Sequence, residues 1–228
     1  MGYTYAQIAK MIDHSLLHPA LTDAELHEGC RIAVNYDVAT VCIKPYYLKR
    51  RVALLGSSTV KPGITVGFPH GGHTTAVKVA EAKEGLRDGA RELDTVVNIG
   101  KVLSRDWDFV RADIAAVVKA GHDGGALVKV IFENCYLKDE HKVALCGICG
   151  EIGADFVKTS TGYGSGGATI EDLKLMRAHS PAHVQVKAAG GIRTLDALLE
   201  VRALGVSRVG ASRTVEILEE CKRRLGKE

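Results

Sequence analysis

The chain has 228 residues, of which 46% are hydrophobic and 25% charged; this composition excludes disorder, and the length allows a core without disulfides or a structural metal. Lysine and arginine total 30 against 27 acidic residues, and a formal net charge of +3 does not support nucleic-acid binding. No apolar run reaches about 18 residues, MGYTYAQIAK is unlike a signal peptide, and the six cysteines lack framework spacing, so we expect a cytoplasmic protein with reduced thiols and no membrane partner.

Short runs rich in β-branched residues recur along the chain at intervals of 25 to 35 residues. They begin near Met11, Val38, Ile64, Glu92, Leu127, Phe156, His183 and Arg208. Helical patterns fill the intervals. Thr22 with Glu25 forms a capping box, Thr169 with Asp172 repeats the device, and Thr194 precedes a third helix.

This alternation predicts the fold. Parallel strands need a crossover, and eight strand–helix units favour a closed (β/α)8 barrel, a TIM barrel, as a single domain over residues 1–228. Residues 1–10 are expected to form a short extra helix that closes the bottom of the barrel. An open doubly wound sheet is the alternative, but IDHSLLHP does not resemble the glycine-rich dinucleotide turn of that fold.

Charged residues inside the strand runs need an explanation, because an unpaired buried charge is costly. Lys129, Lys158 and Lys187 each follow a valine and are expected to point into the barrel, as are Asp94 and Asp13. Repulsion and burial lower the pKa of a lysine, and a neutral amine can form a Schiff base with a carbonyl compound. The alternative is that the lysines are counter-ions for Asp94, Asp13 and Glu133.

Glycine-rich turns follow the last three strand runs: TSTGYGSGGAT, AAGGIRT and GASRT. The last loops of many such barrels bind phosphate through backbone N–H groups. The residues that fit this role are Gly162, Gly190, Gly191, Gly210 and Ser212. Ordinary tight turns are the alternative interpretation. The lysines and the turns together predict a Schiff-base enzyme that acts on a phosphorylated carbonyl compound.

The segments FVKTSTGYGSGGAT and VKAAGGIRT, with IDHSLL, VCIKPYY, VGFPHG, KVIFEN and RVGAS, closely resemble the deoxyribose-phosphate aldolase family. The resemblance implies a class I aldolase with a (β/α)8 fold that needs no metal or other cofactor. Such enzymes cleave 2-deoxy-D-ribose 5-phosphate to acetaldehyde and D-glyceraldehyde 3-phosphate, and they catalyse the reverse condensation. It also implies a homodimer or homotetramer whose partners are small phosphorylated sugars and aldehydes.

The resemblance implies a role for individual residues. Lys158 would carry the Schiff base, Lys187 would keep Lys158 neutral, and Asp94 would move protons with a water. Asp13 and Cys42 are expected at the substrate pocket, although a core cysteine is the alternative for Cys42. Arg213 stands where the family often has a small or hydroxyl residue, so it removes a phosphate contact or adds a cation.

Other motifs give weaker signals. Cys146 and Cys149 form a lone C-x-x-C and are expected to be small buried residues of a helix rather than a redox or metal site. His70 and His73 lack an obvious third zinc ligand. Two rival functions remain: a Schiff-base aldolase for a different phosphorylated sugar, and a phosphate-binding barrel without catalysis.

Overall fold

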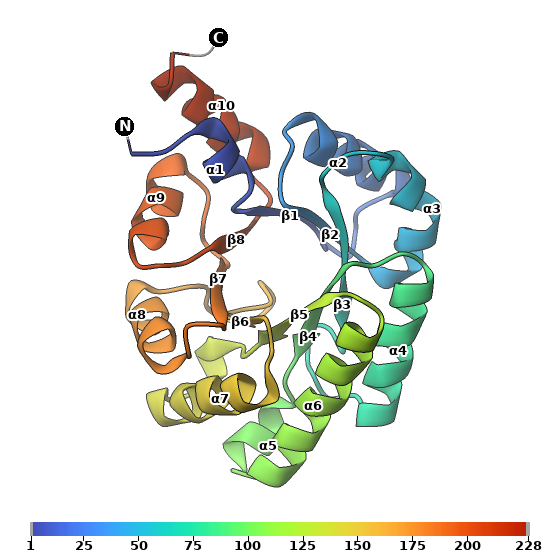
Figure 1. The fold of residues 1–228 in the computed structure, drawn as a ribbon, viewed down its shortest axis with the longest axis vertical. Helices are drawn as coiled ribbons and strands as arrows, with labels where there is room; N and C mark the ends of the chain where they lie inside the picture. The colour runs from blue at the N-terminus through green and yellow to red at the C-terminus, as the bar shows by residue number, and fades with distance from the viewer. Residues whose placement is uncertain (1, 227–228) are drawn as a thin grey trace.

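The computed structural model describes residues 2–226 and contains a closed barrel of parallel strands arranged in chain order. The strands are β1 (Ile12–Leu16), β2 (Thr40–Ile43), β3 (Lys61–Val66), β4 (Glu92–Val96), β5 (Leu127–Ile131), β6 (Phe156–Lys158), β7 (Gln185–Ala189) and β8 (Arg208–Ala211). The ring closes where β1 pairs with β8, with Ile12 opposite Val209. Figure 1 shows this ring surrounded by helices. The predicted (β/α)8 architecture is therefore confirmed.

The helices pack on the outer face of the barrel. They are α1 (Tyr5–Ala9), α2 (Asp23–Asn35), α3 (Pro45–Leu55), α4 (Thr75–Arg87), α5 (Ile99–Leu103), α6 (Trp107–Asp123), α7 (Asp139–Ile152), α8 (Ile170–His179), α9 (Leu195–Ala203) and α10 (Thr214–Arg224), with a 3₁₀ turn at Asn134–Tyr136. Two helices, α5 and α6, lie between β4 and β5, which explains why that strand interval is the longest. Among residues 2–226, none of the helices has the length and apolar character of a membrane span.

The helix starts predicted from threonine are confirmed. The Thr22 hydroxyl accepts a hydrogen bond from the Glu25 N–H, and the Glu25 carboxylate accepts one from the Thr22 N–H, which completes a capping box. Thr169 and Thr194 accept hydrogen bonds from backbone N–H groups at the starts of α8 and α9. Each cap satisfies a backbone N–H group that has no partner within its helix. The cap therefore fixes the residue at which the helix begins.

The strand register decides which side chains enter the barrel. Asp94 lies opposite Lys129 across β4 and β5, and Lys158 lies opposite Lys187 across β6 and β7. Paired residues of neighbouring strands point to the same face, so these charges face the interior together. Their neighbours in sequence, among them Leu93, point outward and are fully buried under the helices.

Two details differ from the sequence-based expectation. Strand β3 begins at Lys61 rather than near Ile64, because Lys61 pairs with Thr40 of β2 although Pro62 and Gly63 resemble turn residues. Helix α1 packs against α10 at the edge of the barrel. It leaves the N-terminal mouth open, with a cavity of about 480 Å³ there. The predicted short extra helix is present as α1, but the expectation that it closes the bottom of the barrel is wrong.

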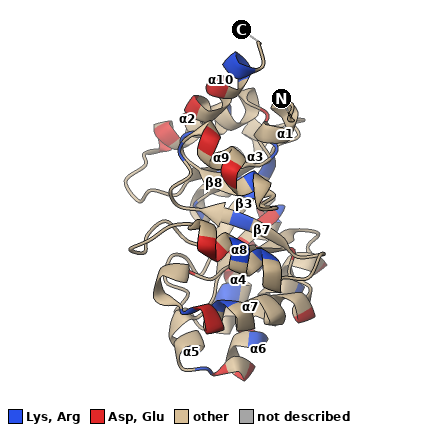
Figure 2. Cartoon of the chain, turned by 90° about the vertical axis from the view of Figure 1, so that its left-hand side faces the viewer, with Lys and Arg blue, Asp and Glu red and all other residues tan. Residues whose placement is uncertain are grey.

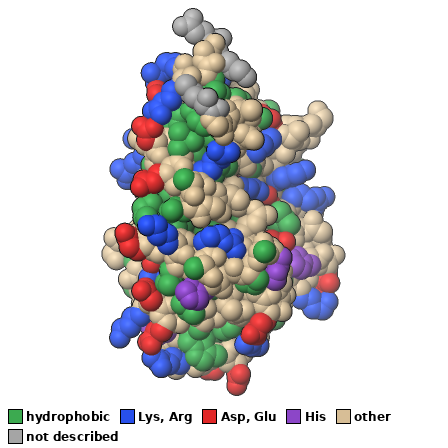
Figure 3. Space-filling view, turned by 60° about the vertical axis from the view of Figure 1, so that its left-hand side comes forward, with side chains coloured by type: hydrophobic (Ala, Val, Ile, Leu, Met, Phe, Trp, Pro, Cys, Tyr) green, Lys and Arg blue, Asp and Glu red, His purple; other side chains and the backbone are tan. Residues whose placement is uncertain are grey.

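The surface charge is mixed. In Figure 2, lysine, arginine, aspartate and glutamate alternate along the helices on the side that faces the viewer. On the face shown in Figure 3, basic and acidic side chains are scattered among apolar ones. Both views agree with the small net charge of +3.

Candidate active site

The interior of the barrel holds a cluster of buried charged side chains centred on Asp94. Its Oδ2 atom lies 2.7 Å from the Nζ atom of Lys158 and 2.7 Å from that of Lys187. The Lys187 amine also donates to Asp13 at 2.5 Å. All of these side chains are 3% exposed or less. The predicted inward orientation of Lys158, Lys187, Asp94 and Asp13 is confirmed.

Lys129 belongs to the same cluster but has different partners. Its Nζ lies 2.8 Å from Asp94 Oδ1, 3.3 Å from Asp13 Oδ2 and 2.5 Å from a Glu92 oxygen. Arg208 contacts Asp13 and, at 2.5 Å, the other oxygen of Glu92. Glu133, which the sequence offered as a counter-ion, instead contacts Thr161. Lys129 is thus a counter-ion within the cluster, held by three carboxylates.

The charges of the cluster do not balance when every lysine is protonated. Four cationic side chains, Lys129, Lys158, Lys187 and Arg208, face three carboxylates, Asp13, Glu92 and Asp94. Excess charge in a buried site is costly because the surroundings solvate it poorly. Loss of one proton from a lysine restores the balance.

Lys158 is the lysine that loses this proton most readily. Burial lowers its pKa, and the Lys187 ammonium adds to that effect, while Asp94 and Cys42 oppose them only in part. Burial acts on Lys187 and Lys129 in the same direction, but Asp13 and Asp94 outweigh it and raise the pKa of each. The three lysine ammonium groups together overcome burial and hold the pKa of Asp94 well below its usual value. The result is one nucleophilic amine beside an ionised carboxylate.

A cavity of about 760 Å³ opens at the C-terminal ends of the strands and reaches Lys158. It is lined by all five residues predicted for phosphate: Gly162, Gly190, Gly191, Gly210 and Ser212. Lys187, Asp94, Asp13 and Cys42 are buried and do not line it. Cys42 lies among the charges, and burial and Asp94 raise the pKa of its thiol to about 11.

The glycines of this cavity are required by the backbone. Gly162, Gly190 and Gly191 have φ angles of 91°, 82° and 95°, which other residues rarely adopt. A Cβ atom on Gly190 would lie 2.8 Å from the Cα of Gly167, so the β6 and β7 loops meet there backbone to backbone. Backbone N–H groups can approach an anion closely in such turns.

Two arginines near this cavity take opposite positions. Arg193, in the segment GGIRT, lines the cavity. Arg213 points to Glu216 on the surface, at 2.7 Å, and does not line it. Arg193 was not among the predicted site residues, although it lies in the segment AAGGIRT that was singled out for its glycines.

Comparison with known proteins identifies the family of the chain. A family model described as "DeoC/LacD family aldolase" matches residues 7–211. The chain belongs to this aldolase family. It is 60% identical over 224 residues to the deoxyribose-phosphate aldolase of Rhodopirellula baltica, covering 98% of this chain and 93% of that protein. It is 47% identical over 215 residues to the deoxyribose-phosphate aldolase of Thermococcus kodakarensis, covering 93% and 96% of the two chains.

Solved structures show the same fold. The structure of a putative deoxyribose-phosphate aldolase from Coccidioides immitis superposes with a TM-score of 0.92 at 37% identity, covering 96% of this chain and 87% of that one. The deoxyribose phosphate aldolase of Aeropyrum pernix, described as a tetramer, gives a TM-score of 0.89 at 31% identity, covering 96% and 92%. As a member of this aldolase family, the protein is a carbon–carbon lyase with a barrel active site.

Cys146, Cys149, His70 and His73 do not line the cavity of the aldolase. Cys146 and Cys149 are fully buried on α7, as the sequence predicted. His70 and His73 are exposed in the loop after β3. Within residues 2–226, histidine, cysteine, aspartate and glutamate do not gather in a group of three or more that could hold a metal ion.

Glu133 contacts Thr161 and so supports the loop that carries Gly162. This contact was not predicted from the sequence. The Glu133 carboxylate accepts hydrogen bonds from the N–H of Thr161, at 3.2 Å, and from the Thr161 hydroxyl. Glu133 is 2% exposed and has a φ angle of 57°, which is costly for a residue with a side chain. Its position directly after the segment KVIF was the available signal. We infer that it holds the loop in the shape that receives substrate.

Replacing Glu133 with glutamine is expected to raise KM for the sugar phosphate by roughly 10- to 100-fold, since a hydrogen bond to a charged group is worth about 1.5–3 kcal/mol. The value of kcat should change less, because Glu133 has no contact with the amine of Lys158. Steady-state kinetics measure both constants. Glu171→Gln, on the exposed side of α8, is the matched control. An unchanged KM would show that the loop keeps its shape without this carboxylate.

Proposed function

We propose that this chain reversibly cleaves 2-deoxy-D-ribose 5-phosphate to acetaldehyde and D-glyceraldehyde 3-phosphate through a Schiff base on Lys158. The observation that carries the proposal is that Lys158, whose pKa is lowered by burial, lines a cavity that is also lined by glycine-rich turns. The names of the curated relatives support the choice of sugar, since they are called deoxyribose-phosphate aldolases at 60% and 47% identity.

The first stage forms the covalent intermediate. The neutral Lys158 amine adds to the C1 aldehyde of the open-chain sugar, and the carbinolamine takes up a proton and loses water to give a protonated imine. Asp94 accepts hydrogen bonds from both Lys158 and Lys187, so it fixes the direction from which the Lys158 amine reaches C1. The Lys187 ammonium keeps Lys158 deprotonated between turnovers.

The second stage breaks the C2–C3 bond, because the hydroxyl group lies on C3 and the imine on C1. The electron pair of that bond moves toward the imine nitrogen, and the C3 hydroxyl loses its proton. Glyceraldehyde 3-phosphate leaves, and an enamine remains on Lys158. Protonation of C2 and hydrolysis of the resulting imine release acetaldehyde and restore the amine.

We assign these proton movements to Asp94 working with a water. Because the pKa of Asp94 is held so low, its carboxylate is ionised in the resting enzyme and acts as an acceptor first. The neighbouring Lys187 ammonium, at 2.7 Å, is the nearest source from which a proton is returned. Asp13 fixes Lys187 from its other side.

The 5-phosphate is proposed to bind at the turns after β6, β7 and β8. Gly162, Gly190, Gly191 and Gly210 offer backbone, Ser212 offers a hydroxyl, and all of them line the cavity. Arg193 adds a cation from the same side. Cys42 is proposed only as a neighbour of the reacting amine, since its raised pKa keeps it a thiol.

Activity toward a set of phosphorylated aldoses and ketoses tests the proposal. We expect acetaldehyde release from 2-deoxy-D-ribose 5-phosphate to exceed turnover of the other sugars. A higher kcat/KM for another phosphorylated sugar would overturn the substrate while leaving the aldolase family intact. Binding of the sugar phosphate without any cleavage would overturn the catalytic proposal.

The phosphate group is expected to contribute much of the specificity. We expect kcat/KM for 2-deoxyribose to be roughly a hundredfold or more below that for its 5-phosphate, since anion contacts are worth about 1.5–3 kcal/mol each. Inorganic phosphate should inhibit competitively. Ser212→Ala should weaken the preference, whereas Arg213→Ala, the neighbouring control whose side chain pairs with Glu216, should not. Equal kcat/KM for both sugars would contradict the phosphate site and leave the lysine chemistry standing.

We further propose that the protein is a homodimer or homotetramer of single barrel domains in the cytoplasm. The tetramer described for the Aeropyrum pernix relative supports an oligomer. The free thiols of Cys42, Cys135, Cys146 and Cys149 support a reducing compartment. Light scattering of the purified protein measures the assembly, and a monomer would contradict this part of the proposal.

A further inference from the structure

The N-terminal mouth of the barrel contains a second cavity, at the end opposite the sugar pocket. It has a volume of about 480 Å³. Most of its lining comes from residues at or just before the starts of strands: Lys10, Ala39, Thr59, Lys61, Arg91, Glu92, Gly125, Leu127 and Arg208. Parallel strands all begin at one end of a barrel, so these residues share none of the lining of the sugar pocket.

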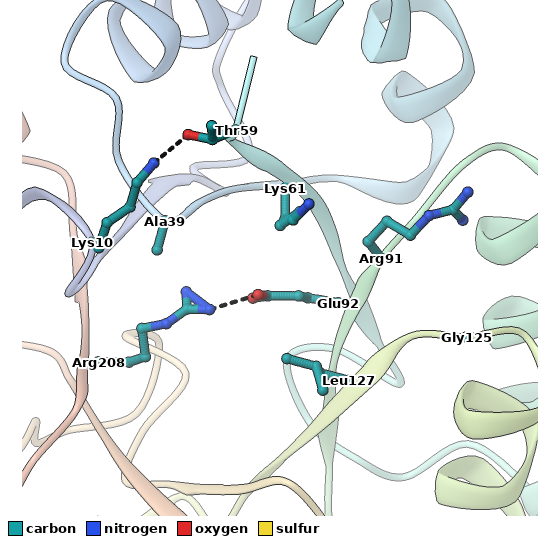
Figure 4. Close-up of a pocket in the computed structure, with 9 residues that line it drawn as sticks. All are labelled: Lys10, Ala39, Thr59, Lys61, Arg91, Glu92, Gly125, Leu127 and Arg208. Atoms are coloured by element: carbon teal, nitrogen blue, oxygen red, sulfur yellow. Dashed lines mark hydrogen bonds and ion pairs between the residues drawn. The ribbon is translucent and has the colours of Figure 1, made fainter. Parts of the chain in front are cut away.

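Positive charge dominates this cavity. Four cationic side chains line it against the single carboxylate of Glu92, and Figure 4 shows Arg208 reaching Glu92 near the centre of the view. Lys10 lies on one side, where its amine contacts Asp37 at 2.6 Å and Thr59 at 2.5 Å. A concave surface lined by one sign of charge concentrates counter-ions.

Lys61 and Arg91 are the cations that remain available. They stand at the starts of neighbouring strands, Lys61 as the first residue of β3 and Arg91 just before β4. Neither has a carboxylate partner within the described residues 2–226. The only side-chain hydrogen bond that Arg91 makes there goes to the carbonyl of Ala90, at 3.1 Å. Two adjacent cations without a carboxylate partner beside a cavity favour the binding of an anion.

The cavity also has an apolar side. Leu127, the first residue of β5, is 41% exposed and lines the cavity. Ala39 also lines the cavity, on the side of Lys10. Inorganic ions gain nothing from such a surface, whereas the carbon skeleton of an organic anion is stabilised by covering it.

We propose that the N-terminal mouth binds a small organic anion with at least two phosphate or carboxylate groups, held by Lys61 and Arg91 with its carbon skeleton on Leu127. The site is separate from the sugar pocket and does not depend on the proposed substrate. It reaches the catalytic charges through Arg208, whose guanidinium faces the mouth and also contacts Asp13, the partner of Lys187. An anion at the mouth therefore approaches the floor of the active site.

Calorimetric titration of the intact protein with citrate and with glycerol 1,3-bisphosphate tests the proposal. Competitive inhibition of sugar cleavage by a probe reports its binding to the sugar pocket alone. We therefore expect calorimetry to detect additional binding of the probe that does not compete with the sugar. The double variant Lys61→Ala, Arg91→Ala should weaken the non-competitive binding at least about tenfold while keeping the competitive inhibition constant. Tighter binding of one probe identifies the site as one for carboxylates or for phosphates.

The matched control is Lys49→Ala, Lys174→Ala, which removes the same charge from exposed, unpaired positions on α3 and α8. It should bind both probes as the wild type does. Three results would overturn the proposal. The wild type could bind the probes only in competition with the sugar, the Lys61→Ala, Arg91→Ala variant could bind them as tightly as the wild type does, or the control variant could lose as much affinity as that variant. Thermal unfolding of both variants verifies that they are folded to the same extent.

Discussion

Replacing Lys158 with methionine is expected to lower kcat by roughly 10⁴-fold or more, since loss of a covalent nucleophile removes the whole pathway that depends on it. Trapping with acetaldehyde and borohydride should place an ethyl group on Lys158 in the wild type. The variant should carry none. Peptide mapping after digestion measures both. The expectation rests on the lowered pKa of Lys158 and on its place in the lining of the cavity.

Lys129→Met is the matched control for the trapping experiment, because Lys129 is equally buried and contacts the same Asp94. The Lys129 ammonium has a raised pKa and does not line the cavity. The control should therefore still be labelled on Lys158, whatever its rate. An ethyl group found on Lys129 or Lys187 of the wild type would show that the nucleophile has been assigned to the wrong strand.

Replacing Lys187 with leucine is expected to reduce activity by about ten- to a hundredfold near pH 7. The loss should shrink toward about pH 9.5, where a lysine amine is more readily deprotonated. Removal of the Lys187 cation leaves three cations facing three carboxylates, so Lys158 can keep its proton without excess charge. The pKa of Lys158 therefore rises, and less neutral amine is present at neutral pH.

The pH–rate profile of kcat/KM distinguishes this electrostatic role from a direct one. An acid limb displaced to higher pH is the expected result for Lys187→Leu. Lys187→Arg keeps the cation and should displace the limb much less, even if its geometry slows the reaction. Equal losses near pH 7 and pH 9.5 would mean that Lys187 acts by contact with the substrate or as the proton donor alone.

Much of the fold could be predicted from short-range signals. The threonine caps at Thr22, Thr169 and Thr194 depend on residues three positions away, and the recurrence of strands depends only on spacing. The start of strand β3 was predicted too far along the chain, near Ile64 instead of Lys61. Its first residues are set by pairing with β2, which no local sequence pattern encodes. The path of α1 depends on its packing against α10, from the other end of the chain.

The site was predictable where alternation along a strand decides orientation. Lys158, Lys187 and Asp94 lie in strand interiors, so the period of two places them inside the barrel. Arg208 and Glu92 are the first residues of β8 and β4, where a charged residue is ordinarily solvated, and their contact spans the barrel. The direction of Arg213 depends on Glu216 in the following helix turn, and the sequence allowed either direction.

The charge count of the buried cluster has a consequence for the energy of the covalent cycle. With Lys158 as a neutral amine, three cations face three carboxylates; the protonated imine adds one positive charge that the surroundings cannot match. When the electrons of the breaking bond reach the nitrogen, the proton of the C3 hydroxyl passes to the Asp94 carboxylate, so the enamine stage keeps the same excess of positive charge. The barrel interior returns to neutrality only when the last imine is hydrolysed and the extra proton leaves. The charge balance of the cluster therefore favours release of acetaldehyde over persistence of the covalent intermediate.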